Sequence, residues 1–220
     1  MAYPVWNQGT ADYLIKSYYL LRANGTIRIP SPIVADYILQ SMYRTSPALI
    51  PMDLQTVSLD QFVRVAITNI NHQNLAGSKG TGIDHKRYER QLQMEFYRAC
   101  CCILRPEYIV SADVGRHYNS IGFVDFYIGQ TRWAIEITRN SNKLQEHIDR
   151  FHTNGIYALI PMNAWVVVDF VQKNSLLNLE NDPAPVGDRE NVWTVYWCPV
   201  THYIRLFKGH NDLGKDLLVG

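Results

Sequence analysis

The alternation of apolar and polar positions divides the chain into a mostly helical first part and a mixed second part. Apolar residues recur at helical spacing over 11–22 and 33–44, and a short strand is predicted between them at 26–30. A further helix is predicted over 58–72, and the glycine-rich stretch 74–85 is predicted to be a connector. The resulting boundaries are a helical N-terminal segment over 1–74, a linker over 75–86 and a larger domain over 87–220.

The second part begins with an amphipathic helix over 86–104 and continues mainly in strands whose apolar positions alternate with a period of two. A second helix is predicted over 142–152. The strands are expected at 108–114, 121–128, 131–138, 165–170, 192–197 and 203–207. The order α-β-β-β-α-β predicts an α/β fold with a mixed sheet.

Two acidic residues interrupt this pattern in the middle of the domain. Asp125 and Glu136 lie in "GFVDFYIGQTRWAIEITRN", which is otherwise rich in aromatic and β-branched residues. If Gly129-Gln130 forms a two-residue turn, Asp125 faces Ala134 and becomes a diagonal neighbour of Glu136. Carboxylates held this close repel each other, and a divalent cation bound between them removes the repulsion.

A third carboxylate is expected from the preceding helix, where Glu95 lies beside Gln91 at the edge of the apolar stripe. Packed against the sheet, Glu95 could reach the same cation, so the three carboxylates together predict a metal site. Each residue also allows a structural role. Glu95 could pair with Arg98 or Arg139, and Asp125 could cap a turn.

Composition narrows the class of protein but does not identify a partner. Of the 220 residues, 47% are hydrophobic and 19% charged, as in ordinary globular proteins. The formal net charge is +1, so nucleic-acid binding would require a local basic patch. The sequence predicts no membrane-spanning stretch and no secretory signal, and its four cysteines are expected to be reduced. These features favour an intracellular protein without a membrane partner.

A glutamate on a helix, an aspartate on a strand and a Glu-x-x at the next strand resemble the layout of the PD-(D/E)xK nuclease superfamily. More narrowly, the chain resembles the C-terminal nuclease-like domain of the Crinkler-type proteins of fungi and oomycetes over about 88–170. The segments that carry this resemblance are "ERQLQMEFYRACCCIL", "SADVGRHYNSIGFVDFYI" and "WAIEITRNSNKLQEHIDRFHTNGIY". In the first part, "LIKSYYLLRANGTIRIPSPIVADYI" is similar to the winged-helix segment that follows the ATPase in such proteins.

The resemblance implies a restriction-endonuclease-like core that uses Mg²⁺ or Mn²⁺ to hydrolyse phosphodiester bonds in DNA. The implied metal ligands are Asp125, Glu136, Glu95 and the carbonyl of Ile137. In the superfamily, a lysine two residues after the glutamate positions the attacking water. Here this position is Thr138, which carries no charge.

The missing charge could come from the next helix, on which Lys143, His147 and Arg150 follow one another at i, i+4 and i+7. Lys143 is the first candidate for the role of the lysine, and Arg139 is the second. The expected substrate-binding residues are His147, Arg150, Gln91 and Thr138. A solvated helix face, stabilised by ion pairs among its own residues, is an equally open interpretation.

Two functions are therefore consistent with the sequence. The first is a metal-dependent endonuclease acting on DNA, as in a Crinkler-type effector. The second is a catalytically weak or inactive nuclease-fold module that binds nucleic acid or a protein partner. An ATPase domain supplied elsewhere and an oligomer are compatible with both functions. The expected location is the cytoplasm or nucleus, and for an effector the nucleus of the host.

Overall fold

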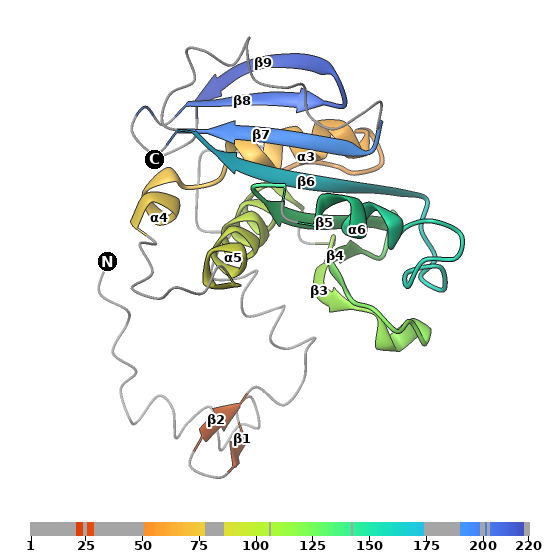
Figure 1. Cartoon of the computed structure of the whole chain (residues 1–220). Coiled ribbons are helices and arrows are strands. Elements are labelled where there is room, and N and C mark those ends of the chain that lie inside the picture. The colour runs from red at the N-terminus through yellow and green to blue at the C-terminus, as the bar shows by residue number, and fades with distance from the viewer. Residues whose placement is uncertain are drawn as a thin grey trace. The chain divides into compact units, whose positions relative to one another are not determined.

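The chain divides into two compact units, Met1–Pro47 and Ala48–Gly220. Its structure, a computed structural model, describes residues 21–23, 26–28, 51–77, 86–105, 107–141, 143–173, 190–198, 201 and 203–217 (Figure 1).

The described residues of the first unit form an antiparallel pair of strands, β1 (Leu21–Ala23) and β2 (Thr26–Arg28). The strand predicted at 26–30 is therefore present. Residues 21 and 22, which were predicted to end a helix, belong to a strand instead, because they pair with β2. The rest of the helix predicted over 11–22, and the helix predicted over 33–44, lie outside the described residues.

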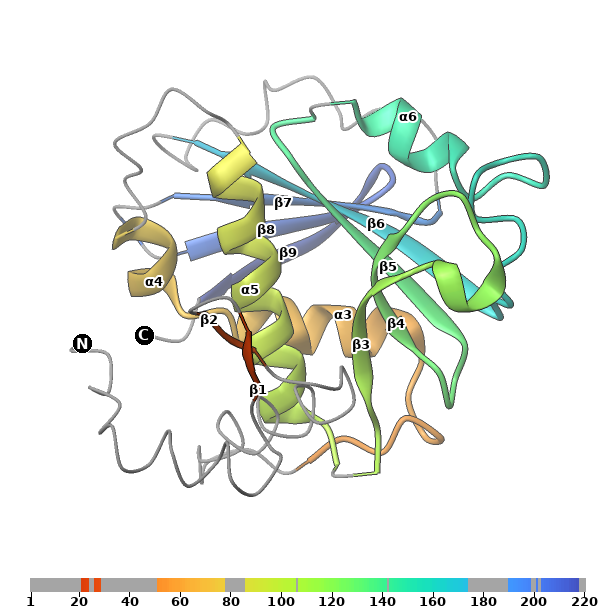
Figure 2. The ribbon, with the colours of Figure 1, turned by 90° about the horizontal axis from the view of Figure 1, so that it is seen from below.

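The second unit is built around a seven-stranded sheet in the order β3-β4-β5-β6-β7-β8-β9 (Figures 1 and 2). β5 pairs in parallel with β6, and β6 with β7, whereas all other neighbours in this sheet are antiparallel. The strands are β3 (Val110–Val114), β4 (Val124–Ile128), β5 (Trp133–Arg139), β6 (Ala164–Gln172), β7 (Val192–Trp197), β8 (Tyr203–Lys208) and β9 (Asn211–Leu217). The predicted α/β class with a mixed sheet is confirmed.

Helices cover both faces of this sheet because both faces are apolar. α5 (Lys86–Ile103) and α3 (Leu59–Thr68) pack on one face, where Phe96 contacts Phe126 with ring centroids 5.5 Å apart. On the same face, Phe62 of α3 contacts Trp133 at 6.0 Å. The other face is covered by α6 (Leu144–Asp149) and the loop after it, which share a buried cluster with β4, β5 and β6. In Figure 1, α6 lies in front of β5 and α3 lies behind the sheet.

The structure places α3 with the sheet and not with the N-terminal segment predicted over 1–74, since the second unit begins at Ala48. Phe62, Val63, Ala66 and Ile67 of α3 are buried, and Arg64 forms an ion pair with Asp216 of β9 at 2.9 Å. Helical periodicity shows that α3 has an apolar face but does not show which part of the chain covers it.

A short helix, α4 (His72–Gly77), occupies the start of the stretch predicted to be a linker. The remainder of that stretch, 78–85, lies outside the described residues. β9, an edge strand, was not predicted. Its sequence, "NDLGKDL", lacks the apolar alternation that marks strands with a buried face.

The cap at the N-terminus of α3 can be tested by mutation. Ser58 and Gln61 form a capping box, in which each side chain accepts a hydrogen bond from the backbone N–H of the other. Replacing Ser58 by Ala should lower the free energy of unfolding by about 1 kcal/mol in urea titration. Ser58→Asp, which keeps an acceptor at this position, should remain close to wild type. Equal losses in both variants would contradict a capping role.

Candidate functional site

Asp125 and Glu136 come together because of the way β4 and β5 pair. Phe126 faces Ile135, so the next position of the register brings Asp125 opposite Glu136. Four residues, 129–132, connect the strands, and the predicted two-residue turn is therefore wrong. Arg132, the last residue of this connection, has a left-handed φ of 57°. β5 therefore begins at Trp133, two residues after the predicted start at 131.

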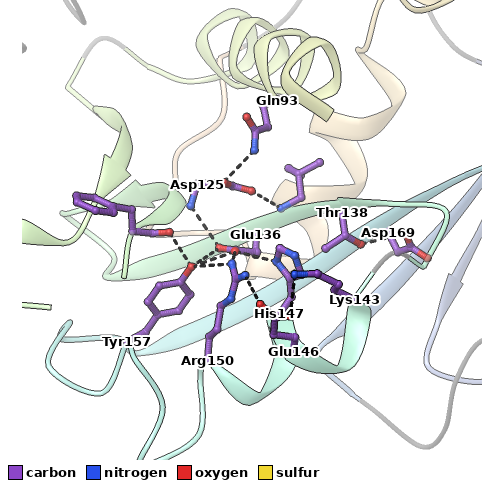
Figure 3. Close-up of polar contacts among 12 residues, drawn as sticks. Gln93, Asp125, Glu136, Thr138, Lys143, Glu146, His147, Arg150, Tyr157 and Asp169 are labelled. Carbon is purple, nitrogen blue, oxygen red and sulfur yellow. Dashed lines mark hydrogen bonds and ion pairs between the residues drawn. The ribbon is translucent and has the colours of Figure 1, made fainter. Parts of the chain in front are cut away.

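Each of the two carboxylates accepts a hydrogen bond from the backbone of the other strand (Figure 3). The N–H of Asp125 donates to Oε2 of Glu136 at 3.4 Å, and the N–H of Ile137 donates to Oδ2 of Asp125 at 2.8 Å. The other oxygen of Asp125 accepts a hydrogen bond from Nε2 of Gln93 on α5 at 3.0 Å. Asp125 therefore joins β4, β5 and α5.

The two side chains nevertheless turn toward different helices. Val124 and Tyr127 both belong to the buried cluster below α6, so the regular alternation of β4 is interrupted between them. The neighbouring strand β3 is irregular at the same level, where Asp113 has a left-handed φ of 53°. As a result, Asp125 contacts α5, whereas Glu136 contacts residues of α6 and the loop after it (Figure 3).

The carboxylate of Glu136 is 1% exposed and is surrounded by hydrogen-bond donors. It lies 2.9 Å from Nδ1 of His147, 2.8 Å from the guanidinium of Arg150, and 3.0 and 3.2 Å from the hydroxyl of Tyr157. We call Glu136, His147, Arg150 and Tyr157 together the Glu136 network. A buried carboxylate is strongly unfavourable unless it is paired and hydrogen-bonded, and this network meets both conditions.

Protonation within the network follows from these contacts. Burial and the charge of Glu136 raise the pKa of Tyr157, so its hydroxyl stays neutral and acts as a donor. Burial disfavours the charged form of Arg150, but Tyr157, Glu136 and Glu146 outweigh this effect and raise its pKa. Because a carboxylate oxygen only accepts hydrogen bonds, Nδ1 of His147 carries a proton. The network therefore contains a buried ion pair with two further donors.

Glu95 does not join the other two carboxylates. It is buried between α4 and α5, where it accepts hydrogen bonds from Nδ2 of Asn74 at 2.7 Å and Nε of Arg98 at 2.9 Å. The ion pair with Arg98, one of the alternatives open in the sequence, is present. Across the described part of the chain, no group of three or more His, Cys, Asp or Glu side chains is placed to hold a metal ion.

Thr138, at the position where the resemblance to nucleases implies a lysine, has a structural contact. Its hydroxyl donates to Oδ1 of Asp169 on β6 at 3.0 Å, and Asp169 also accepts hydrogen bonds from the N–H and hydroxyl of Ser141. Asn140, Ser141 and Lys143 all have left-handed backbones, with φ between 52° and 55°. The buried Asp169 therefore holds the turn between β5 and α6, and Thr138 supports it.

The predicted basic row divides into two parts. α6 begins at Leu144 and not at 142, which leaves Lys143 outside the helix. The amine of Lys143 is paired with Glu146 at 3.3 Å, and its side chain is 64% exposed. His147 and Arg150 instead turn inward to Glu136. Arg139 is the last residue of β5 and is partly exposed.

Two contact residues were not identified from the sequence. Gln91, which was expected to bind substrate, is partly buried on α5, but Gln93 is the residue of this helix that contacts Asp125. The helical spacing of Gln93 and Phe96 places them on one face, and this is the signal that could have found Gln93. Tyr157 lies in an irregular loop, where the sequence pattern contained no indication of its role.

Compared with protein-family models, curated proteins and solved structures, the chain has no significant match. The resemblance to nucleases therefore rests on the motifs quoted above. None of the helices in the described ranges is long and apolar enough to cross a membrane.

The Glu136 network can be tested by removing its cation. Arg150→Met leaves a buried carboxylate without its ion pair and should lower the free energy of unfolding by about 3 kcal/mol or more in urea titration. Adding Glu136→Gln to this variant should recover part of the loss, because the uncompensated charge is then gone.

Lys143→Met is the matched control for this experiment. It removes a cation of the same region that is exposed and paired with the exposed Glu146, so the expected loss is below about 1 kcal/mol. Similar losses for Arg150→Met and Lys143→Met would contradict the structural role of the network.

Proposed function

We propose that this chain is a nuclease-like module that has no hydrolytic activity and acts by binding a partner. The observation that supports this proposal is the environment of Glu136. Its carboxylate, which a nuclease would use to bind metal, is 1% exposed and forms a buried ion pair with Arg150.

The side chains as arranged do not fit a magnesium or manganese ion. A divalent cation needs free carboxylate oxygens, and the oxygens of Glu136 already accept hydrogen bonds from Arg150, Tyr157 and other donors. A cation at this place would also be repelled by the guanidinium of Arg150, and this repulsion is poorly screened in a buried site.

The groups expected to assist hydrolysis are also engaged elsewhere. The hydroxyl of Thr138 donates to Asp169, and the amine of Lys143 is paired with Glu146. Activation of a water molecule and stabilisation of the charge that develops on a phosphate both need a cationic group aimed at the reacting atoms. This requirement favours a binding function over a hydrolytic one.

A metal-dependent endonuclease acting on DNA is the second candidate. One observation favours it: Asp125 and Glu136 lie opposite each other on adjacent strands, and Asp125 is partly exposed. Hydrolysis would require His147 and Arg150 to leave Glu136, after which both would be available for a phosphate. The Crinkler-type relationship, an ATPase domain supplied elsewhere and action in the cytoplasm or nucleus are compatible with either candidate.

Metal titration and DNA cleavage distinguish the two candidates. Calorimetric titration of the full chain with Mg²⁺ or Mn²⁺ should show no binding in the millimolar range, and supercoiled plasmid and single-stranded oligonucleotides should stay intact. Asp125→Asn, which keeps an oxygen acceptor for Ile137 or Gln93, should behave as the wild type does. Metal-dependent nicking by the wild type that is lost in Asp125→Asn would refute the proposal and support the endonuclease.

A further inference from the structure

Four large apolar side chains are exposed on two loops next to the Glu136 network. Ile121 is 86% exposed and Phe123 42% on the loop before β4, and Ile156 is 41% exposed and Leu159 62% on the loop after α6. We call these four residues, together with Arg116, the loop surface. Large apolar side chains exposed close together are unfavourable in water and commonly mark interaction sites.

The two loops are fastened to each other. The hydroxyl of Ser120 donates to the carbonyl of Ile156 at 2.6 Å, and the hydroxyl of Tyr157 donates to the carbonyl of Phe123 at 2.6 Å. A Cβ atom on Gly122 would lie 2.3 Å from the side chain of Ile156, so Ile156 packs directly on the backbone between the other two apolar side chains. The two loops that carry the loop surface are therefore held together.

The Glu136 network holds this surface in shape. The hydroxyl of Tyr157 lies 2.6 Å from the carbonyl of Phe123 and 3.0 Å from the carboxylate of Glu136, so its single proton is shared between two acceptors and links the buried ion pair to the exposed loops (Figure 3). A surface that is ordered before binding loses less conformational entropy when a partner docks. The network thus has a role in binding as well as in stability.

Arg116 supplies the exposed positive charge of the loop surface, since Arg150 is paired with Glu136 and Glu146, and His152 lies 3.6 Å from Asp149. Residues 115–123 and 150–160 contain arginine and histidine but no aspartate or glutamate. Arg116 is exposed, and its guanidinium lies 5.7 Å from the ring centroid of Phe123. An apolar surface with an exposed arginine at its edge is complementary to a segment that carries aliphatic side chains and a carboxylate.

The composition of the surface favours a protein over a nucleic acid. Three of the four apolar side chains, Ile121, Ile156 and Leu159, are aliphatic, and among the four only Phe123 offers a ring on which a base could stack. Affinity for a nucleic-acid backbone depends on neutralising several phosphates, and the nearby His152 is already close to Asp149. These features leave too little cationic surface for a phosphate backbone.

We propose, building on the binding function proposed above, that the loop surface docks an acidic segment of a partner protein through its aliphatic side chains. The aliphatic side chains of the segment contact the four apolar residues, and a carboxylate pairs with Arg116. The partner is thus defined by its chemistry as an acidic, aliphatic-rich peptide segment.

The test uses a phage-displayed library of random peptides of about 12 residues, selected on the full chain; interaction segments of this length are sufficient to span a small patch. Selection should enrich peptides that contain aliphatic residues together with Asp or Glu. Ile121→Ser and Leu159→Ser should weaken the binding of the enriched peptides about tenfold or more. Arg116→Glu should lose the acidic peptides and select basic ones, while circular dichroism stays unchanged.

Ile109→Ser is the matched control, because Ile109 is 41% exposed and precedes β3, at the end of this strand opposite to the loops. The control should bind the enriched peptides as the wild type does. The proposal is overturned if no such peptides are enriched or if the control weakens binding equally. It is also overturned if short DNA or RNA oligonucleotides bind in a manner that depends on Ile121 and Leu159.

This experiment is independent of the metal titration. Peptide binding could persist in a chain that cleaves DNA, in which case only the lack of hydrolysis would be refuted. Conversely, an inactive chain that selects no acidic peptides would leave the first proposal standing and remove this one.

Discussion

The buried ion pair between Glu136 and Arg150 is the interaction on which the arrangement of this domain depends. A carboxylate that is 1% exposed can remain charged only if donors reach it from several directions. Here the donors come from α6 through His147 and from the following loop through Tyr157. Satisfying one charge therefore positions a strand, a helix and a loop relative to one another. The hydroxyl of Tyr157 also contacts the carbonyl of Phe123, and this contact positions a second loop.

The same constraint explains why Arg150 and His147 contact a carboxylate of the fold itself. Arginine and histidine are donors for a phosphate, but they are equally good donors for a carboxylate. Because the carboxylate belongs to the fold itself, Arg150 and His147 bind Glu136 in the absence of any ligand. Asp169 acts in a similar way one strand further on, where it accepts from Thr138 and holds the turn before α6. The polar groups of the site are thus paired with each other, and the exposed chemistry lies on the loops above them.

The strands with buried faces could be predicted from the sequence, because the alternation of their apolar residues can be recognised from neighbouring positions alone. The strand at 192–197 was predicted with its observed ends, since its run of β-branched and aromatic residues lies between Asn191 and the dipeptide Cys198-Pro199. Prediction from the local pattern failed where the structure of a segment depends on contacts with a distant part of the chain. The edge strand β9 is paired on only one side, and α3 is buried against a sheet that lies far from it in sequence. The length of the turn after β4 depends on the left-handed backbone conformation of Arg132, which the pattern of apolar residues does not indicate.

By itself, the sequence determined that Asp125 and Glu136 lie on two strands, since both residues fall within recognisable strand patterns. It also determined the α/β class, because the alternation of helices and strands is a local property. Only the tertiary structure decided where each carboxylate points. Glu95 turned toward Arg98 and Asn74, and Glu136 toward Arg150, because each charge was satisfied by the donors that packing brought nearest. Arg98 is three residues from Glu95 on the same helix, and helical spacing could indicate this pair. Asn74 and Arg150 are more distant in sequence from the carboxylates that they contact, so these partners follow from the fold and not from spacing.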